Sequence, residues 1–274
     1  MTPYLKSIYI YPIKGLRGLL QREALVEPRG LVQDRCWMLV DQQNRFLSQR
    51  KVPVLVRLVA TATEAGLRLS AAGAPELEVA RPGKEAPRLK VRIWRDVVQA
   101  ACAREDANQW FSDVTGQPCR LVYMDDPAAR PVDPAHNPGD AVVSFADGFP
   151  VLLTSEQSLA SLNERMAEPV SMLRFRPNVT VDGFAPFAED GWREIQIGDV
   201  RFSVVKPCSR CVVTTIDQET AKAGKEPLRT LSTFRKRGGN VYFGENLVPQ
   251  GQGIIRTGDA VTILSCRMAA QRFF

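Results

Sequence analysis

The stretch CWMLVDQQNRFL at residues 36–47 indicates which class of fold this chain adopts. Two mainly apolar runs, residues 36–40 and 45–47, flank the four polar residues DQQN, an arrangement typical of a β-hairpin. The same arrangement returns at residues 89–94 and 97–102, which are separated by two residues. Short strands joined by tight turns are therefore expected to build the first part of the chain.

Outward from this hairpin, residues 4–102 contain further short strands and little helical pattern. Leu5, Ile8 and Ile10 begin one strand, and residues 54–63 can pair with residues 67–70. Several short strands separated by turn residues are typical of a curled sheet or small barrel. We therefore expect a β-barrel-like domain at the N-terminus.

A helix is expected to follow this region. Ala107, Trp110, Phe111 and Val114 have the spacing of one helix face, and Gly116 can stop the helix. A strand is expected at residues 119–124, and the proline-rich residues 125–140 are expected to form a loop. We place a domain boundary there, which divides the chain into residues 1–125 and 126–274.

The second half mixes strands with helices. Ser155 occupies the N-cap position of a short helix that carries Leu159 and Leu162. A second helix is expected over residues 226–237, and a hairpin over residues 253–266 around Gly258 and Asp259. Further strands are expected at residues 178–181, 194–197 and 200–205. The predicted fold class is α+β and rich in strands.

Length and composition exclude several classes of protein. The 274 residues, 45% of them hydrophobic, are enough to bury two cores. The first ten residues lack the regions of a signal peptide, and no apolar run approaches the roughly 18 residues of a membrane span. Six scattered cysteines favour reduced thiols in a cytoplasm. The net charge of +6 is spread among acidic residues, which favours a solvated surface over nucleic-acid binding.

The segment KPCSRCVVTT at residues 206–215 carries the densest functional pattern. Structural zinc would need about four ligands, yet there is no second cysteine pair and His136 is the only histidine. A redox dithiol would precede a helix, whereas residues 212–216 are β-branched and favour a strand edge. A cysteine nucleophile would need a histidine base. These readings stay open, as does that of two cysteines without a chemical role.

Another reading makes Cys211 a metal ligand. The positive charge of Arg210 favours a thiolate at its neighbour, and a thiolate is a soft metal ligand. One protein thiolate suffices where a cofactor brings the remaining sulfurs, as the dithiolene of molybdopterin does. The phosphate and the pterin of molybdopterin would be bound by cationic side chains, a helix N-terminus and backbone amides of the protein. The candidates for this cradle are Lys14, Gly15, Arg35, Thr154, Ser155, Arg176 and Asn178.

In these motifs the chain resembles the MOSC-domain proteins that carry an N-terminal β-barrel domain, a family that includes the mitochondrial amidoxime-reducing component and its bacterial relatives. The resemblance covers nearly the whole chain in the right order. It implies an N-terminal β-barrel-like domain followed by a MOSC β-barrel domain with peripheral helices. The matching text is YPIKG at 11–15, DRCW at 34–37, TSEQSL at 154–159, RFRPN at 174–178, CSRCVVTTID at 208–217, KEPLRTL at 225–231, FGEN at 243–246 and GDAV at 258–261.

The resemblance also implies roles for individual residues. Cys211 resembles the molybdenum ligand and the catalytic residue, and Ser209 and Arg210 resemble cofactor contacts beside it. Six of the seven cradle candidates match positions that hold the pterin and its phosphate, and the seventh, Gly15, stands where some relatives have serine. Asn246 stands where some members present a tyrosine to the cofactor. Cys208 inherits no ligand role.

The activity implied by the resemblance is a molybdenum-cofactor-dependent reduction of N-hydroxylated compounds, namely amidoximes, hydroxylamines and N-hydroxylated bases. The chain lacks a cysteine motif for an iron–sulfur cluster and a glycine-rich nucleotide fingerprint. Electrons are therefore expected from a separate protein, a ferredoxin or a cytochrome with its reductase. The alternative is a carrier of the cofactor or of sulfur without turnover. We expect a monomer that binds neither nucleic acid nor membrane.

Overall fold

The computed structural model describes residues 2–126, 130–137 and 139–268. Within these residues the largest sheet has nine strands and forms the main body of the molecule. In spatial order its strands are β19 (Val261–Cys266), β14 (Trp192–Ile197), β15 (Val200–Arg210), β17 (Asn240–Pro249), β12 (Val151–Ser155), β13 (Val179–Asp182), β1 (Tyr4–Ile10) and β2 (Leu19–Gln21), and β16 (Lys236–Arg237) pairs with β17.

Smaller sheets complete the fold. A four-stranded sheet has the order β5 (Trp37–Val40), β11 (Arg120–Tyr123), β10 (Asp96–Cys102) and β9 (Arg88–Ile93). Two three-stranded sheets comprise β6 (Val59–Ala62), β7 (Gly66–Ser70) and β8 (Leu77–Ala80), and β18 (Gly253–Arg256), β3 (Glu23–Glu27) and β4 (Gly30–Leu31). The helices of the described residues are α1 (Glu105–Thr115), α2 (Glu156–Asn163) and α3 (Leu228–Phe234).

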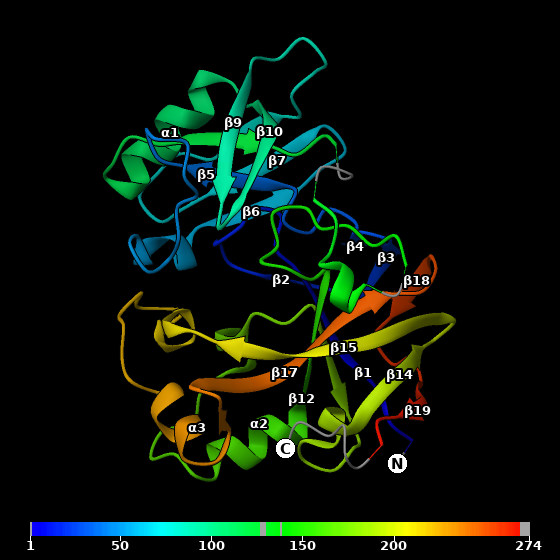
Figure 1. Ribbon diagram of the computed structural model, residues 1–274. Helices are drawn as coiled ribbons and strands as arrows, with labels where there is room; N and C mark the ends of the chain where they lie inside the picture. Colours follow the sequence, from blue (N-terminus) through cyan, green and yellow to red (C-terminus); the bar gives the residue numbers. More distant parts are fainter. Residues whose placement is uncertain (1, 127–129, 138, 269–274) are drawn as a thin grey trace.

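Figure 1 shows two strand-rich parts. The upper part contains β5 to β10 and α1, and the lower part contains the long strands β15 and β17 with α2 and α3 at their edge. The predicted strand-rich α+β fold is confirmed. The division of the chain at residues 125/126 stays a prediction. In space, β1 lies in the large sheet beside β13, so the first strand belongs to the lower part.

Local sequence signals explain several elements. Ile93 pairs with Asp96 across the turn between β9 and β10, as the hairpin pattern indicates. Helix α1 buries Trp110 and Phe111, and it ends where Gly116 takes the left-handed conformation at φ +70°. The side chain of Ser155 accepts a hydrogen bond from a backbone N–H of α2, which confirms the predicted N-cap.

The predicted hairpin at residues 253–266 is wrong, although both of its strands form. Strand β18 pairs with β3, and β19 pairs with β14. The turn between them bonds to β1 instead, since Gly258 N donates to the Leu5 carbonyl and Leu5 N donates to the Asp259 carbonyl, each at 2.8 Å. The two strands therefore lie in different sheets, and the turn between them packs against β1.

Two further elements are shorter than predicted. Pro53 begins a 3-10 helix, Pro53–Arg57, so that the strand expected at residues 54–63 is limited to β6. Helix α3 ends at Phe234 because the following residues pair with β17 as β16, whereas the sequence pattern extended the helix to residue 237. The first change follows from a proline in the sequence, whereas the second comes from strand pairing that local propensity does not report.

The proline-rich loop is held firmly in its described residues. Arg130 is 3% exposed and donates from Nη1 to the carbonyls of Ser144 and Ala146, at 2.5 and 2.8 Å. Its Nε and Nη2 donate to Asp96 at 3.0 and 2.8 Å. Arg130 therefore ties the loop after it to the start of β10. Pro127 and Pro138 of the predicted loop lie outside the described residues.

In the described part of the chain, no helix combines the length and apolar character that a membrane span requires. The cytoplasmic location and the monomeric state stay predictions.

Replacement of Glu189 by glutamine is expected to reduce the loss of stability above neutral pH. Glu189 is 1% exposed, and burial raises its pKa to about 7, although Ser158 Oγ donates to it at 2.7 Å. The folded state therefore keeps a proton that the unfolded chain releases at lower pH. The free energy of unfolding falls as the pH rises between these two pKa values, by about 2 kcal/mol between pH 5.5 and 8.5.

Urea unfolding at pH 5.5 and pH 8.5 tests this prediction. Glu189→Gln should lose clearly less stability than the parent between the two pH values, whereas the exposed control Glu164→Gln should behave as the parent does. A parent-like decline in Glu189→Gln would show that another group carries the effect.

Candidate functional site

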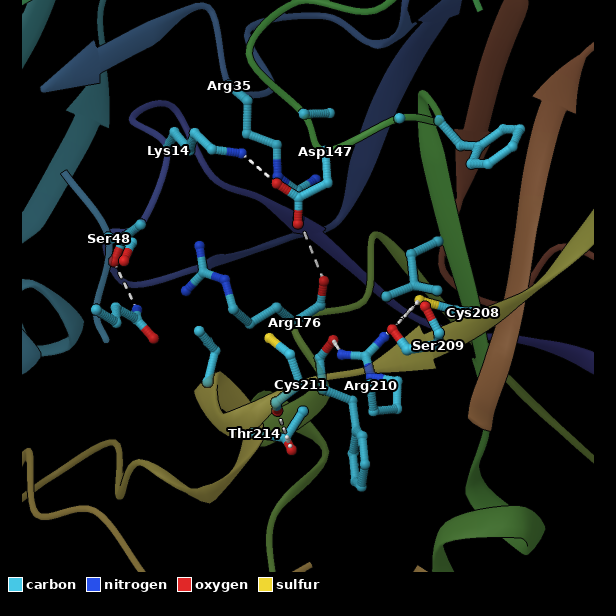
Figure 2. Close-up of a pocket in the computed structure, with 18 of the residues that line it drawn as sticks. Lys14, Arg35, Ser48, Asp147, Arg176, Cys208, Ser209, Arg210, Cys211 and Thr214 are labelled. Atoms are coloured by element: carbon cyan, nitrogen blue, oxygen red, sulfur yellow. Dashed lines mark hydrogen bonds and ion pairs between the residues drawn. The ribbon is translucent and has the colours of Figure 1, made fainter. Parts of the chain in front are cut away.

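A pocket lies between the two strand-rich parts of the molecule. Its lining includes nine of the eleven residues predicted for the cofactor site, which are Lys14, Gly15, Arg35, Arg176, Asn178, Ser209, Arg210, Cys211 and Asn246. Figure 2 shows Lys14 and Arg35 at the top of the pocket and Cys211 with Arg210 below them. Side chains that are far apart in sequence therefore face the same space.

Cys211 lies directly after β15, and its side chain is exposed where it lines the pocket. The residues after it form the 3-10 helix Val212–Thr215, so the strand edge predicted there is wrong. The hydroxyl of Thr214 donates to the carbonyl of Cys211 at 3.0 Å, which replaces a strand hydrogen bond by a local one. The tight turn ends β15 and leaves the thiol at the strand terminus.

Arg210 contacts a different cysteine from the one expected. Its Nη1 donates to Cys208 Sγ at 2.8 Å, and its Nη2 donates to the Phe175 carbonyl at 2.5 Å (Figure 2). Burial raises the pKa of the Cys208 thiol, and the charge of Arg210 offsets this only in part. Cys208 is therefore a protonated thiol at neutral pH, and the expected action of Arg210 on the sulfur of Cys211 is not seen as a direct contact.

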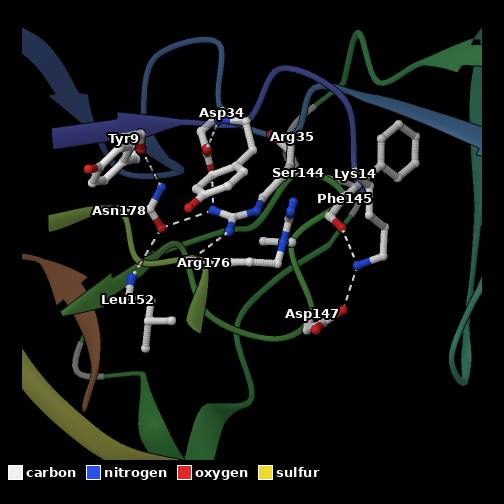
Figure 3. A network of polar contacts seen from close by, with 12 residues as sticks. Tyr9, Lys14, Asp34, Arg35, Ser144, Phe145, Asp147, Leu152, Arg176 and Asn178 are labelled. Carbon is white, nitrogen blue, oxygen red and sulfur yellow. Dashed lines mark hydrogen bonds and ion pairs between the residues drawn. The ribbon is translucent and has the colours of Figure 1, made fainter. Parts of the chain in front are cut away.

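Arg35 is the centre of the polar network in Figure 3. Its Nη1 donates to Asp34 Oδ2 at 2.5 Å and to Asn178 Oδ1 at 2.9 Å, and its Nη2 donates to the Arg176 carbonyl at 3.3 Å. Asn178 is 1% exposed, and its Nδ2 donates to the Tyr9 carbonyl at 3.2 Å. Asn178 therefore positions Arg35 and ties it to the end of β1.

Arg176 carries a charge that the protein leaves largely uncompensated. The ring of Tyr11 contacts it and Arg35 alike, with the guanidinium carbons 4.3 and 4.4 Å from the ring centroid. Arg176 donates from Nη1 to the Leu16 carbonyl at 2.7 Å, and no carboxylate of the described residues forms an ion pair with it. Burial, and then the like charge of Arg35, lower the pKa of Arg176 to about 10. It is still protonated at neutral pH.

Lys14 and Asp147 form an ion pair on the pocket wall. Lys14 Nζ donates to Asp147 Oδ1 at 2.5 Å and to the Phe145 carbonyl at 2.9 Å, and Trp94 Nε1 donates to Asp147 Oδ1 at 2.9 Å. The Asp147 side chain is 75% accessible to water, within a recess of the protein. The surrounding protein disfavours its charge, but Lys14 and the indole outweigh this and hold the pKa of Asp147 well below its usual range. Asp147 is therefore ionised at any working pH.

The balance of charge suits an anionic ligand. Among the described residues, Asp147 is the single carboxylate that lines the pocket, against the five cations Lys14, Arg35, Arg50, Arg176 and Arg210. Two buried polar atoms of lining residues, Arg210 Nε and Gln49 Oε1, also have no hydrogen-bond partner in the described part of the chain. An exposed thiol, surplus cations and unused polar atoms fit a polar anionic group that carries a metal.

Thr154 and Ser155 do not join the other nine predicted residues. Both are fully buried, and neither lines the pocket. Thr154 Oγ1 lies 3.2 Å from Thr180 Oγ1 between neighbouring strands, and Ser155 caps α2. Their contact with a cofactor stays a prediction, and the structure gives each of them a structural role.

The sequence reasoning missed the wall formed by Phe46, Arg50, Trp94 and Asp147. Trp94 offers one signal that could have found it, because a tryptophan follows β9 in a two-residue turn, where asparagine or glycine is usual. Its φ of +55° lies in the left-handed region, which costs a residue with a Cβ roughly 1–2 kcal/mol. An aromatic side chain held against this cost points to a function.

The fold and this pocket define a MOSC-domain protein, and comparison with known families agrees. The MOSC domain profile matches residues 140–262, and that of the MOSC N-terminal beta barrel domain matches residues 2–118. The chain belongs to the family of MOSC-domain proteins with this N-terminal domain.

The chain is similar along most of its length to named members of this family. It is 34% identical to mitochondrial amidoxime-reducing component 1 of Mus musculus, over 94% of this chain and 81% of that protein. The same protein of Homo sapiens is also 34% identical, over 94% and 82% of the two chains. Molybdenum cofactor sulfurase of Oryza sativa subsp. japonica is 29% identical over 88% of this chain, which corresponds to 32% of that longer protein.

Proposed function

We propose that this chain is a molybdenum-cofactor-dependent reductase of N-hydroxylated compounds, with Cys211 as the protein's ligand to the metal. The observation that carries the proposal is the convergence of an exposed thiol and five cationic side chains on one pocket. Relatives named as amidoxime-reducing components and as a molybdenum cofactor sulfurase support a role tied to this cofactor. Arg35, Arg176 and Arg210 would hold its anionic and polar parts.

The reaction breaks the N–O bond of the substrate, consumes two electrons and two protons, and releases water together with the N–H product. When bound, the cofactor supplies the two electrons. Asp147 stays ionised, so it accepts a hydrogen bond from the substrate and supplies no proton of its own. Lys14 Nζ, 2.5 Å from Asp147 Oδ1, is an ionisable proton donor on the pocket wall. Burial lowers the pKa of Lys14, which eases proton release toward the departing oxygen.

The electrons would come from a separate protein. The chain lacks a cysteine motif for an iron–sulfur cluster, so we propose a ferredoxin or a cytochrome with its reductase as the donor. The donor has to approach the exposed Cys211, whose sequence neighbour Val212 is 53% exposed.

A carrier of cofactor or of sulfur is the second candidate function. The relative named as a molybdenum cofactor sulfurase favours it, since that protein shares most of this chain's length without its name implying a reductase. A carrier would hold the cofactor, or sulfur on Cys211, without consuming a substrate. The two functions therefore differ in turnover and not in binding.

The experiment that separates them uses the chain purified from a host that makes molybdenum cofactor. Molybdenum and pterin are measured first, and benzamidoxime reduction with a chemical electron donor second. We expect about one molybdenum per chain and conversion of benzamidoxime to benzamidine. Full cofactor without conversion of any N-hydroxylated substrate would favour the carrier, and absence of both metal and pterin would refute the proposal.

A further inference from the structure

The pocket wall contributed by the N-terminal part combines an aromatic surface with a cation. Trp94 is 41% exposed, and its ring contacts Phe46 at a centroid distance of 4.8 Å. Arg50 Cζ lies 4.9 Å from the Trp94 centroid, which is the range of a cation–π contact. All three residues line the pocket that contains Cys211.

Hydrogen bonds within the fold hold this aromatic wall in place. Trp94 keeps its left-handed backbone conformation while its indole donates to Asp147 at 2.9 Å. Buried Arg130 holds both sides of this contact, because it bonds Asp96 beside the turn and also the carbonyls of residues 144 and 146. The orientation of the indole is therefore fixed by the fold before any ligand binds.

Arg50 is the cation of this wall that has no acidic partner. Its side chain is exposed, and within the described ranges no carboxylate forms an ion pair with it. Asp147, the carboxylate of the pocket, already accepts from Lys14 and Trp94. An arginine guanidinium that stacks on an aromatic ring keeps its N–H groups at the edge, where they can bind a carboxylate or phosphate in a bidentate manner.

We propose that Trp94 and Arg50 select planar aromatic N-hydroxylated substrates that carry an anionic substituent. This inference rests on the proposed reductase function and names the substrate class of the same pocket. The aromatic part of the substrate packs against the Trp94 and Phe46 wall. Its carboxylate or phosphate binds Arg50, which leaves the N–OH group free to reach the region of Cys211 and Asp147.

The test compares benzamidoxime with 4-carboxybenzamidoxime in the parent, Arg50→Gln and Arg95→Gln. Arg95 is the matched control because it is an exposed arginine next to Trp94 that does not line the pocket. With rates normalised to molybdenum content, the parent and Arg95→Gln should prefer the carboxylated substrate by about tenfold in kcat/KM. Arg50→Gln should lose this preference, measured as the ratio of the two kcat/KM values in the same loaded enzyme. A preference that survives in Arg50→Gln would overturn the inference.

The same anionic contact could instead come from the phosphate of the cofactor, and pterin content distinguishes the two sources. A fall in pterin per chain in Arg50→Gln, with unchanged preference in the remaining loaded enzyme, assigns Arg50 to the cofactor and overturns the substrate proposal. Pterin content equal to that of the parent supports it.

A binding measurement keeps this inference separate from the proposed function. 4-Carboxybenzamidine has no N–O bond to reduce, so it binds without turnover. It should quench the tryptophan emission of the parent, and Trp94→Phe should lose most of this quenching. In Arg50→Gln the apparent Kd for 4-carboxybenzamidine should rise at least about fivefold. Quenching without reduction of any substrate would sink the reductase alone, whereas absence of quenching in the parent would sink the selectivity proposal.

Discussion

Replacement of Cys211 by alanine is expected to remove nearly all molybdenum from the chain and to abolish reduction of N-hydroxylated substrates, by at least about 100-fold in kcat/KM. Cys211 is the exposed thiol at the end of β15 that lines the pocket. A soft thiolate is the ligand type that the protein can add to a cofactor with sulfurs of its own. Its loss removes the one covalent anchor that we assign to the metal.

Cys208→Ala is the matched control, because Cys208 lies three residues before Cys211, within β15. The sulfur of Cys208 accepts a hydrogen bond from Arg210 at 2.8 Å, and its raised pKa keeps it protonated at neutral pH. Metal content and activity should therefore stay within a few-fold of the parent. Molybdenum, pterin and benzamidoxime reduction are measured on both variants. Equal losses in both would mean that the two cysteines act together, and full loading of Cys211→Ala would reject Cys211 as the ligand.

Replacement of Arg176 by methionine is expected to have opposite effects on the stability of the empty protein and on cofactor content. The lowered pKa of about 10 shows that the folded protein disfavours the charge of Arg176, because of burial and of Arg35 nearby. This penalty is present at every pH below about 10. An apolar side chain of similar length should therefore raise the free energy of unfolding of the cofactor-free chain by about 1–3 kcal/mol.

The same substitution removes a surplus cation from the pocket. A charge-assisted contact to phosphate is lost, and cofactor content should fall at least about tenfold. Arg174→Met is the control, because Arg174 is two residues away, is ion-paired with Asp217 at 2.9 Å and does not line the pocket. Urea unfolding of the cofactor-free proteins and pterin analysis of the loaded ones measure the two effects. A cofactor-free Arg176→Met that is less stable than the parent would contradict this account of the charge.

Local pattern predicted several elements whose contacts are between neighbours in sequence. The β9–β10 hairpin, helix α1 with its glycine stop and the cap at Ser155 are of this kind. The hairpin at residues 253–266 was predicted wrongly because its strands pair with β3 and β14, and its turn forms two hydrogen bonds with Leu5, some 250 residues away. The helix at residues 226–237 was overextended because β17 recruits its last residues as a strand.

Some residues of the candidate site could be predicted from sequence motifs, and others only from the structure. Lys14, Arg35, Arg176 and Cys211 stand in motifs that can be recognised in the text of the chain, and all four line one pocket. Asp147 stands in no such motif. Its importance comes from Lys14, which reaches it across 133 positions of sequence.

The sequence by itself determined the β-rich fold class and the identity of most pocket cations, because hydrophobic alternation, turn residues and short motifs are local properties. Only the tertiary structure decided that the Thr154 hydroxyl lies against Thr180 inside the sheet, that Arg210 reaches Cys208, and that an aromatic wall faces the site. The physical reason is that the direction of a side chain depends on strand pairing and burial between distant segments. Residue type and spacing carry no record of those partners.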